Sequence, residues 1–156
     1  MTDAIIMTHR GTTVLNAKMV LMGTRATGKT DAIRQAGAVL VEAGCVLPSY
    51  VDGMLAREAV MTTCLGQGIA IPHGRGADLR FVIRTGVSVV QLPEGVDWDL
   101  GERVYLVVGL ASNSDAHAAV LSNLLELLHV PEAIKQLIHT TDPMVVVKRL
   151  TCRRSE

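Results

Sequence analysis

The stretch from Arg103 to Ala111 constrains the fold more than any other part of the sequence. After its leading arginine, this run is almost wholly apolar. A continuous apolar run of this length is typical of a central strand that is buried on both faces. The chain is 49% apolar but only 3% aromatic, so its core must be built from Ala, Val, Leu, Ile and Met. This combination favours helices packed on a sheet, the α/β class.

Shorter patterns predict the elements around this strand. Two further strands are expected at Met19–Met22 and at Phe81–Leu92, with a turn at 93–95 and a polar connection over 96–102. A helix is expected from about Lys29, with Gly44 at its C-terminal cap. Further helices are expected after residues 48–49, after 112–115, from 131 and from 142–143.

The bulk properties exclude several classes of protein. The formal net charge is +0, so no global field attracts nucleic acid or an anionic membrane. The three cysteines, Cys45, Cys64 and Cys152, form no CxxC pair or zinc pattern, which indicates a reducing, cytoplasmic setting. No run reaches the ~20 apolar residues that span a bilayer. We expect a soluble single domain over 1–156, with a core at about 19–150 and short mobile tails.

The segment Gly23–Thr30 is a literal match to the phosphate-binding pattern GxxxxGK[ST]. It follows a strand-like run and precedes a helix, which is the context that this motif requires. Against a nucleotide site, the pattern fixes few positions in a chain with 14 glycines, and no strong strand ends in the acidic residue that would hold magnesium. The alternative is an ordinary loop and helix start.

A second candidate is the apolar run that ends in Pro72-His73-Gly74, beside Arg75. Proline interrupts regular structure and glycine allows a turn, so His73 is offered at a strand end. A packed core histidine is the alternative for any single His. His117 follows the strand that ends at Ala111 and is expected in the first turn of the next helix. If the two strands are neighbours, both rings meet at one edge, beside a helix N-terminus that favours an anion.

This combination of two imidazoles, an arginine and a helix N-terminus indicates a site for a transient phosphoryl group, because a neutral imidazole is nucleophilic near physiological pH. Metal binding is the competing interpretation, with Asp97, Asp99 or Asp115 as a third ligand, but no zinc pattern supports it. The remaining histidines are interpreted as packing or surface residues, at positions 9, 129 and 139.

Four segments together carry a resemblance to a known family: residues 32–44, 50–58, 68–74 and 93–96. They resemble the enzyme IIA component of the bacterial sugar phosphotransferase system, of the mannitol/fructose type and most closely its mannitol branch. The likeness runs from about Met19 to Leu150. The Pro-His-Gly stretch together with the upstream pair Arg57-Glu58 is its most specific part.

The resemblance implies an α/β fold with a mixed sheet of about five strands and helices on its faces. It also implies roles for three residues. His73 would be the phosphorylated nucleophile, through Nε2, His117 the second active-site histidine, and Arg57 the group that neutralises phosphoryl charge. The donor would be the phosphohistidine carrier protein and the acceptor a cysteine of the IIB component, which works with a membrane IIC component. No cofactor or metal is required.

The same resemblance makes Gly23–Thr30 a loop and helix start that binds no nucleotide. One departure is Gln67, where mannitol relatives often carry an acidic residue. Two other functions stay open: a regulatory protein of the nitrogen type, and a nucleotide-dependent kinase that uses Gly23–Thr30. Because the partners are proteins, we expect an apolar surface around His73, with Met54, Met61 and Ile71 as contributors.

Overall fold

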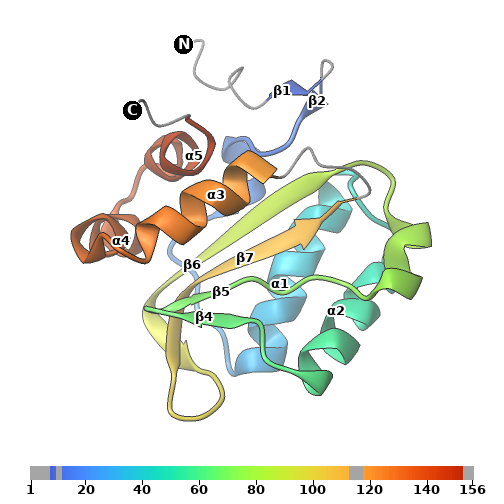
Figure 1. Ribbon diagram of the computed structural model, residues 1–156, viewed down its shortest axis with the longest axis horizontal. Coiled ribbons are helices and arrows are strands. Elements are labelled where there is room, and N and C mark those ends of the chain that lie inside the picture. The colour runs from blue at the N-terminus through green and yellow to red at the C-terminus, as the bar shows by residue number, and fades with distance from the viewer. Residues whose placement is uncertain (1–7, 10–11, 113–117, 153–156) are drawn as a thin grey trace.

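The computed structural model describes residues 8–9, 12–112 and 118–152. Its centre is a five-stranded sheet with the order β3-β6-β7-β5-β4 (Figure 1). The strands are β3 (Val20–Leu21), β4 (Cys64–Gly66), β5 (Ile69–Ala70), β6 (Gly86–Asp97) and β7 (Arg103–Ala111). β3 is parallel to β6 and β5 to β7, whereas β6–β7 and β4–β5 are antiparallel. The expected mixed sheet of about five strands is confirmed.

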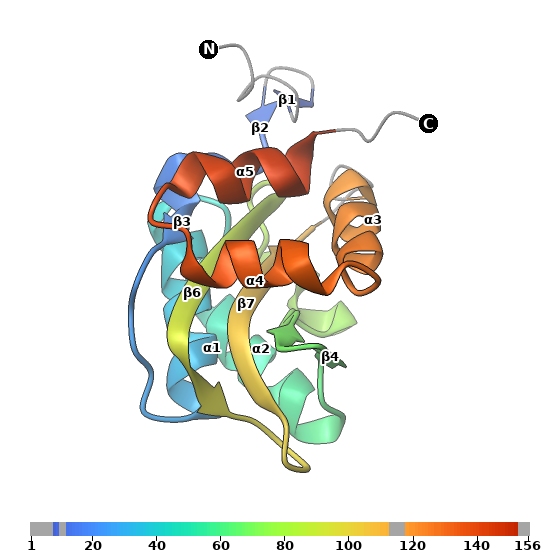
Figure 2. The ribbon, with the colours of Figure 1, turned by 90° about the vertical axis from the view of Figure 1, so that its left-hand side faces the viewer.

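Helices cover both faces of this sheet. α1 (Lys29–Glu42) and α2 (Ser49–Val60) lie on one face, and α3 (Ala118–Leu127), α4 (Pro131–His139) and α5 (Pro143–Thr151) lie on the other (Figures 1 and 2). Successive side chains of β7, such as Leu106, Val107 and Val108, are all buried. Because successive residues of a strand point to opposite faces, β7 is buried on both sides, which confirms the expectation from its apolar run.

The other elements are short. A separate two-stranded sheet joins β1 (Thr8–His9) to β2 (Thr12–Thr13), and two 3-10 helices span Ala17–Met19 (η2) and Gly76–Phe81 (η3). Val14 and Leu15 are fully buried, although they precede the start of the core expected from the sequence. Among the described residues, none of the helices is long and apolar enough to span a bilayer.

The end of α1 follows the cap that the sequence predicts. Gly44 adopts a left-handed backbone with φ +79°. Its N–H donates to the carbonyl of Val41, and the N–H of Cys45 donates to the carbonyl of Leu40. These two bonds form a Schellman motif, which glycine permits because it has no Cβ.

The second half of β6 differs from the expectation. The sequence predicted a strand over 81–92 and a turn at 93–95, but residues 76–81 form η3 and β6 continues to Asp97. An irregularity lies between Gln91 and Val96, where Gly95 has φ +75°, and the ladder resumes with Val96 opposite Val104. The buried Val96–Val104 pair gives the extension a hydrophobic reason that local turn residues do not reveal.

The topology places the strand ends of interest at one edge. β5 and β7 are parallel neighbours, so their C-terminal ends lie side by side. The ladder extends beyond β5 as a bridge between His73 and Leu110, with the Leu110 N–H donating to the carbonyl of Pro72. The condition set by the sequence analysis, that the two strands are neighbours, is therefore met, and His73 lies at their common edge. His117 lies outside the described residues.

Candidate functional site

The imidazole of His73 is held by its own strand. Nδ1 lies 2.8 Å from the carbonyl oxygen of Ile71, and the side chain is half-buried. A backbone carbonyl only accepts hydrogen bonds, so this contact requires the ring proton on Nδ1. In the neutral ring Nε2 then carries the lone pair. The local backbone therefore selects the tautomer in which Nε2 is the nucleophilic atom.

The turn after His73 is fixed by the Tyr50 side chain from the first turn of α2. The Tyr50 hydroxyl donates to the Leu110 carbonyl at 2.7 Å and accepts from the Gly74 N–H at 2.9 Å. A Cβ on Gly74 would lie 2.6 Å from a Tyr50 ring carbon, so this close approach requires glycine. Burial raises the pKa of the Tyr50 hydroxyl, which keeps it protonated as a donor.

His73 lines a cavity of about 360 Å³ at this edge of the sheet. The walls come from the start of α2, the ends of β5 and β7, the segment after His73, and α3. The lining residues are Tyr50, Ile71, His73, Gly74, Arg75, Gly76, Leu79, Leu110, Ser112 and Leu121. Arg75 is the one charged side chain among these described lining residues.

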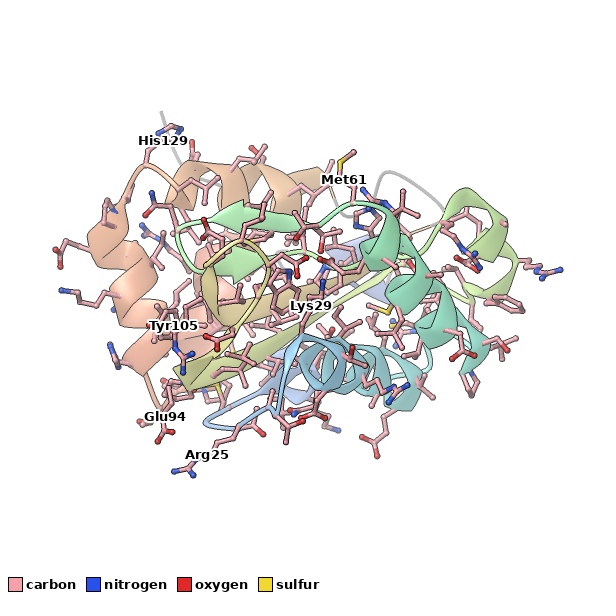
Figure 3. The ribbon with its side chains drawn as sticks, turned by 90° about the horizontal axis from the view of Figure 1, so that it is seen from below. Arg25, Lys29, Met61, Glu94, Tyr105 and His129 are labelled. Carbon is pink, nitrogen blue, oxygen red and sulfur yellow. The ribbon has the colours of Figure 1, made fainter. Side chains whose placement is uncertain are left out.

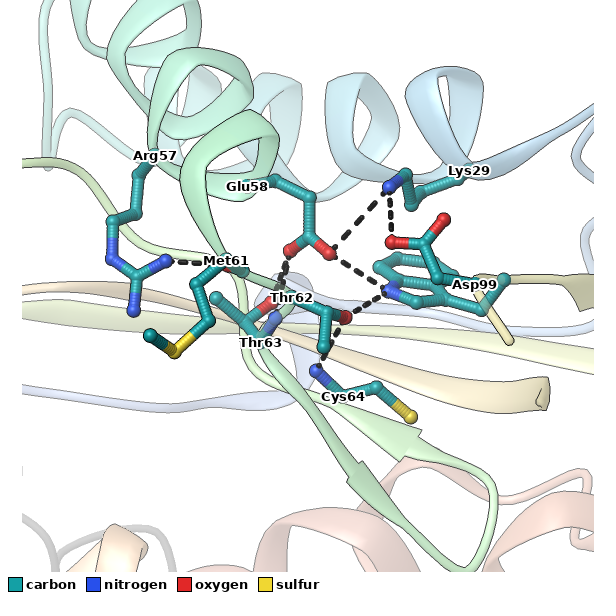
Figure 4. Close-up of polar contacts among 9 residues, drawn as sticks. Lys29, Arg57, Glu58, Met61, Thr62, Thr63, Cys64 and Asp99 are labelled. Carbon is teal, nitrogen blue, oxygen red and sulfur yellow. Dashed lines mark hydrogen bonds and ion pairs between the residues drawn. The ribbon is translucent and has the colours of Figure 1, made fainter. Parts of the chain in front are cut away.

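Arg57 lies near this site but is not among the described residues that line the cavity. The Ile71 N–H donates to the Thr63 carbonyl at 3.0 Å, so the antiparallel β4–β5 pairing continues toward Met61 on one strand and His73 on the other. Arg57 Nη1 donates to the Met61 carbonyl at 2.5 Å (Figure 4). The guanidinium is therefore held at the end of α2, on the side of the hairpin that leads to His73.

A buried carboxylate supports the same hairpin. Glu58 is 4% exposed, and its Oε1 accepts from both the backbone N–H and the hydroxyl of Thr63. Its Oε2 accepts from the Trp98 indole N–H at 3.0 Å and lies 3.7 Å from the Lys29 ammonium (Figure 4). This network links the end of α2 to the start of β4, the start of α1 and the segment after β6.

Three backbone donors of the glycine-rich segment are already engaged. The N–H groups of Gly23 and Thr24 donate to the side-chain and main-chain oxygens of Gln91, at 2.8 and 3.1 Å. The Thr27 N–H donates to an oxygen of Asp31 at 2.9 Å. A phosphate-binding loop needs such N–H groups for the ligand, so these contacts favour the interpretation as an ordinary loop and helix start.

The lysine of this motif is engaged as well. Lys29 Nζ lies 2.7 Å from an Asp99 carboxylate oxygen, in addition to its approach to Glu58. Lys29 lies near the centre of the view in Figure 3, whereas Arg25 and Glu94, which form a 3.0 Å ion pair, lie at the rim of that view. The ammonium thus stabilises the protein's own carboxylates.

Two of the carboxylates considered as metal ligands pair with basic side chains instead. Asp97 pairs with Arg103 and Asp99 pairs with Lys29, whereas Asp115 lies outside the described residues. Within the described part of the chain, no three His, Cys, Asp or Glu side chains are grouped so that they could hold a metal ion. His129 and His139 are exposed and lie outside the cavity lining.

Sequence reasoning missed Tyr50 and Asp78, and it counted the arginine beside His73 among the features of a phosphoryl site without giving Arg75 a specific contact. Asp78 is buried, and its carboxylate accepts from Arg75 Nε at 2.9 Å and Nη2 at 3.0 Å. The i,i+3 spacing of Arg75 and Asp78 is visible in the sequence. Tyr50 has no such local signal, because its partners are 24 and 60 residues away.

Comparisons with known proteins agree on one family. The family model described as "Phosphoenolpyruvate-dependent sugar phosphotransferase system, EIIA 2" matches residues 13–151. A "Multiphosphoryl transfer protein" of Xanthomonas campestris is 46% identical over 137 residues, which are 88% of this chain but only 16% of that protein. A "Mannitol-specific phosphotransferase enzyme IIA component" of Geobacillus stearothermophilus is 38% identical, over 80% of this chain and 86% of that protein.

A solved structure shows the same architecture. It is a complex of enzyme IIAMtl and phosphorylated enzyme IIBMtl from Escherichia coli, with a TM-score of 0.80 and 38% identity. The match covers 89% of this chain and 98% of that chain. The likeness thus extends over most of the chain.

Proposed function

Because the chain belongs to the EIIA 2 family of the phosphoenolpyruvate-dependent sugar phosphotransferase system, we propose that it is a phosphoryl carrier whose phosphorylated atom is Nε2 of His73. The donor is the phosphohistidine carrier protein, and the acceptor is a cysteine of a IIB component that works with a membrane IIC component. The transported substrate is a sugar or hexitol such as mannitol. The observation that carries the proposal is the 2.8 Å contact between Nδ1 and the Ile71 carbonyl.

This contact suits both halves of the reaction. The Nε2 lone pair attacks phosphorus, and the N–P bond of the donor breaks with its electron pair returning to the donor nitrogen. The proton stays on Nδ1, where it donates to the Ile71 carbonyl, so the phosphorylated ring carries a positive charge and is a good leaving group. The thiolate of IIB then attacks phosphorus, and the electron pair returns to Nε2. No proton has to leave His73 in either step.

The proposed roles of Arg57 and His117 follow from charge. A phosphoryl group carries negative charge on its peripheral oxygens, which a guanidinium neutralises best. The position of Arg57, beside the hairpin that ends at His73, supports this role. His117 belongs to the segment that follows β7, and we propose that it contacts the phosphoryl group or steadies the His73 ring.

Exposed apolar side chains near the site suit protein partners. Val60 and Met61, beside the anchored Arg57, are 79% and 65% exposed, and Leu79 in the cavity wall is also exposed. Exposed apolar groups that gather beside a polar site are typical of interaction surfaces. Met61 and the half-buried Ile71 fit the sequence-based expectation, but Met54 is fully buried and the expectation for it was wrong. Its side chain faces the core because α2 packs there.

The direct test is phosphorylation by phosphoenolpyruvate and the purified upstream carriers. We expect acid-labile labelling of the wild type, none of His73→Ala, and full labelling of His129→Ala and His139→Ala, which change exposed histidines far from the cavity lining. Unchanged labelling of His73→Ala would overturn the proposal. Transfer from the labelled protein to a IIB component separates a transport role from the regulatory, nitrogen-type alternative, which uses the same histidine chemistry without that acceptor.

A further inference from the structure

The cavity beside His73 contains a cation to which the proposed function gives no specific contact. Arg75 is the one charged side chain among the described residues of its lining. A phosphoryl group on His73 would bring two negative charges to this cavity, while the Arg57 guanidinium is held on the Met61 carbonyl outside the lining. Arg75 is therefore the described cation that is best placed to meet the new charge.

The orientation of Arg75 is fixed before any phosphate arrives. Its backbone N–H, Nε and Nη2 all donate to the Asp78 carboxylate, at 2.8, 2.9 and 3.0 Å. Asp78 is itself fixed, because it is buried against Gly53, where an added Cβ would lie 2.2 Å from the carboxylate. A guanidinium that is oriented in advance loses little freedom when it binds an anion.

The contact with Asp78 leaves donors free. A guanidinium has five N–H donors, and Asp78 takes one on Nε and one on Nη2. The other three, including both on Nη1, have no hydrogen bond to the described residues. The side chain is 50% exposed, so these donors are accessible from the cavity mouth.

We propose that Arg75, held by Asp78, binds the peripheral oxygens of the phosphoryl group on His73 and stabilises the phosphorylated state. Arg75 is thus a second cationic group of the site, in addition to Arg57, and Asp78 is its positioning residue. This inference rests on the proposed function, because it needs phosphoryl transfer to His73. No bond of the reaction forms or breaks at Arg75.

The test is the equilibrium constant for transfer between the phosphorylated carrier protein and this protein. Limiting phosphorylated carrier is mixed with the wild type, Arg75→Ala or Arg80→Ala, and the phosphoryl group on each protein is quantified at equilibrium. Arg80 is the matched control, because it lies on the 3-10 helix that Arg75 precedes as the N-cap, stacks on Phe81 and is not among the cavity lining residues. Arg75→Gln, which removes the charge but keeps a donor for Asp78, replaces Arg75→Ala if that variant does not fold.

We expect the equilibrium constant to fall about tenfold or more in Arg75→Ala or Arg75→Gln, since a charge-assisted hydrogen bond is lost, and to stay within twofold of the wild type in Arg80→Ala. A residue that only docks the partner changes the forward and reverse rates equally. An unchanged equilibrium constant in the Arg75 variants therefore overturns the proposal, even if both rates fall. If the wild type takes no phosphoryl group on His73, the proposed function fails as well.

Discussion

Two glycine-containing segments of this chain resemble phosphate sites in the sequence, and the structure treats them in opposite ways. In Gly23–Thr30, backbone donors and the Lys29 ammonium are engaged by Gln91, Asp31 and Asp99. In Pro72–Gly74, one ring nitrogen of His73 is engaged by its own strand and the residue lines a cavity. The lysine of the first segment is thus paired with the protein's own carboxylates, whereas the histidine of the second segment lines a cavity.

Glu58 links Lys29 of the glycine-rich segment to Thr63, at the start of the hairpin that leads to His73. Its removal is expected to have the largest effect on stability. The buried carboxylate accepts from Thr63 and Trp98 and approaches Lys29. Glu58→Ala would remove the acceptor of the Thr63 N–H and hydroxyl, whereas Trp98 keeps Thr62 and Lys29 keeps Asp99. We expect a loss of about 3 kcal/mol in the free energy of unfolding. Chemical denaturation measures this loss. Glu58→Gln, which retains an acceptor oxygen, should lose clearly less, and equal losses in the two variants would contradict the network.

The variant Lys29→Met distinguishes two possible roles of this lysine, stabilising the fold and binding phosphate. The Lys29 side chain is 26% exposed and pairs with Asp99 at 2.7 Å, so we expect a loss of about 2 kcal/mol in stability. Phosphorylation of His73 should stay within about twofold of the wild type, because transfer does not use this ammonium. Lys18→Met, at an exposed position, is the control for stability. If the wild type binds magnesium-ATP and Lys29→Met does not, Gly23–Thr30 is a nucleotide site and the interpretation as an ordinary loop and helix start is wrong.

Tyr50→Phe is expected to loosen the Pro72–Gly74 segment without changing the shape of the core. It removes the hydroxyl that joins the Leu110 carbonyl to the Gly74 N–H, and we expect a loss of about 1–2 kcal/mol in stability. Because the turn after His73 is then less fixed, phosphoryl transfer should also slow. Tyr105→Phe is a suitable control, since this half-buried ring lies away from the cavity lining. Equal transfer rates in both variants would show that the hydroxyl has only a structural role.

The smallest expected effect concerns pH. Hydrogen bonding to Arg75 holds the pKa of Asp78 below its usual value. A carboxyl with a lowered folded-state pKa stabilises the fold above its unfolded-state pKa of about 3.9, and this contribution is lost as the pH falls through the folded-state pKa. The stability difference between the wild type and Arg75→Gln should thus be constant above about pH 5 and shrink below about pH 3.9. Denaturation series at several pH values measure it, and a constant difference down to pH 2 would contradict the pair.

Regular patterns in the sequence were enough to predict the frame of the site. The apolar run of β7 predicted a strand buried on both faces. The positions of His73 and of the segment after Ala111 indicated a common sheet edge on the condition that the two strands are neighbours, which the structure shows. The partners that distinguish the two segments were not predictable. Lys29 and Asp99 are 70 residues apart in the sequence, and Tyr50 and Leu110 are 60 residues apart. Contacts between residues so far apart leave no periodic pattern in the sequence.

The central claim is that phosphate is carried by Nε2 of His73 and not by the glycine-rich segment. It is tested most directly by ¹⁵N–³¹P NMR of the phosphorylated, isotope-labelled wild type. We predict a single phosphorus coupled to Nε2 of His73, with a proton retained on Nδ1, where the Ile71 carbonyl holds it. Phosphorus on Nδ1, on another histidine, or on any residue of Gly23–Thr30 would contradict the account.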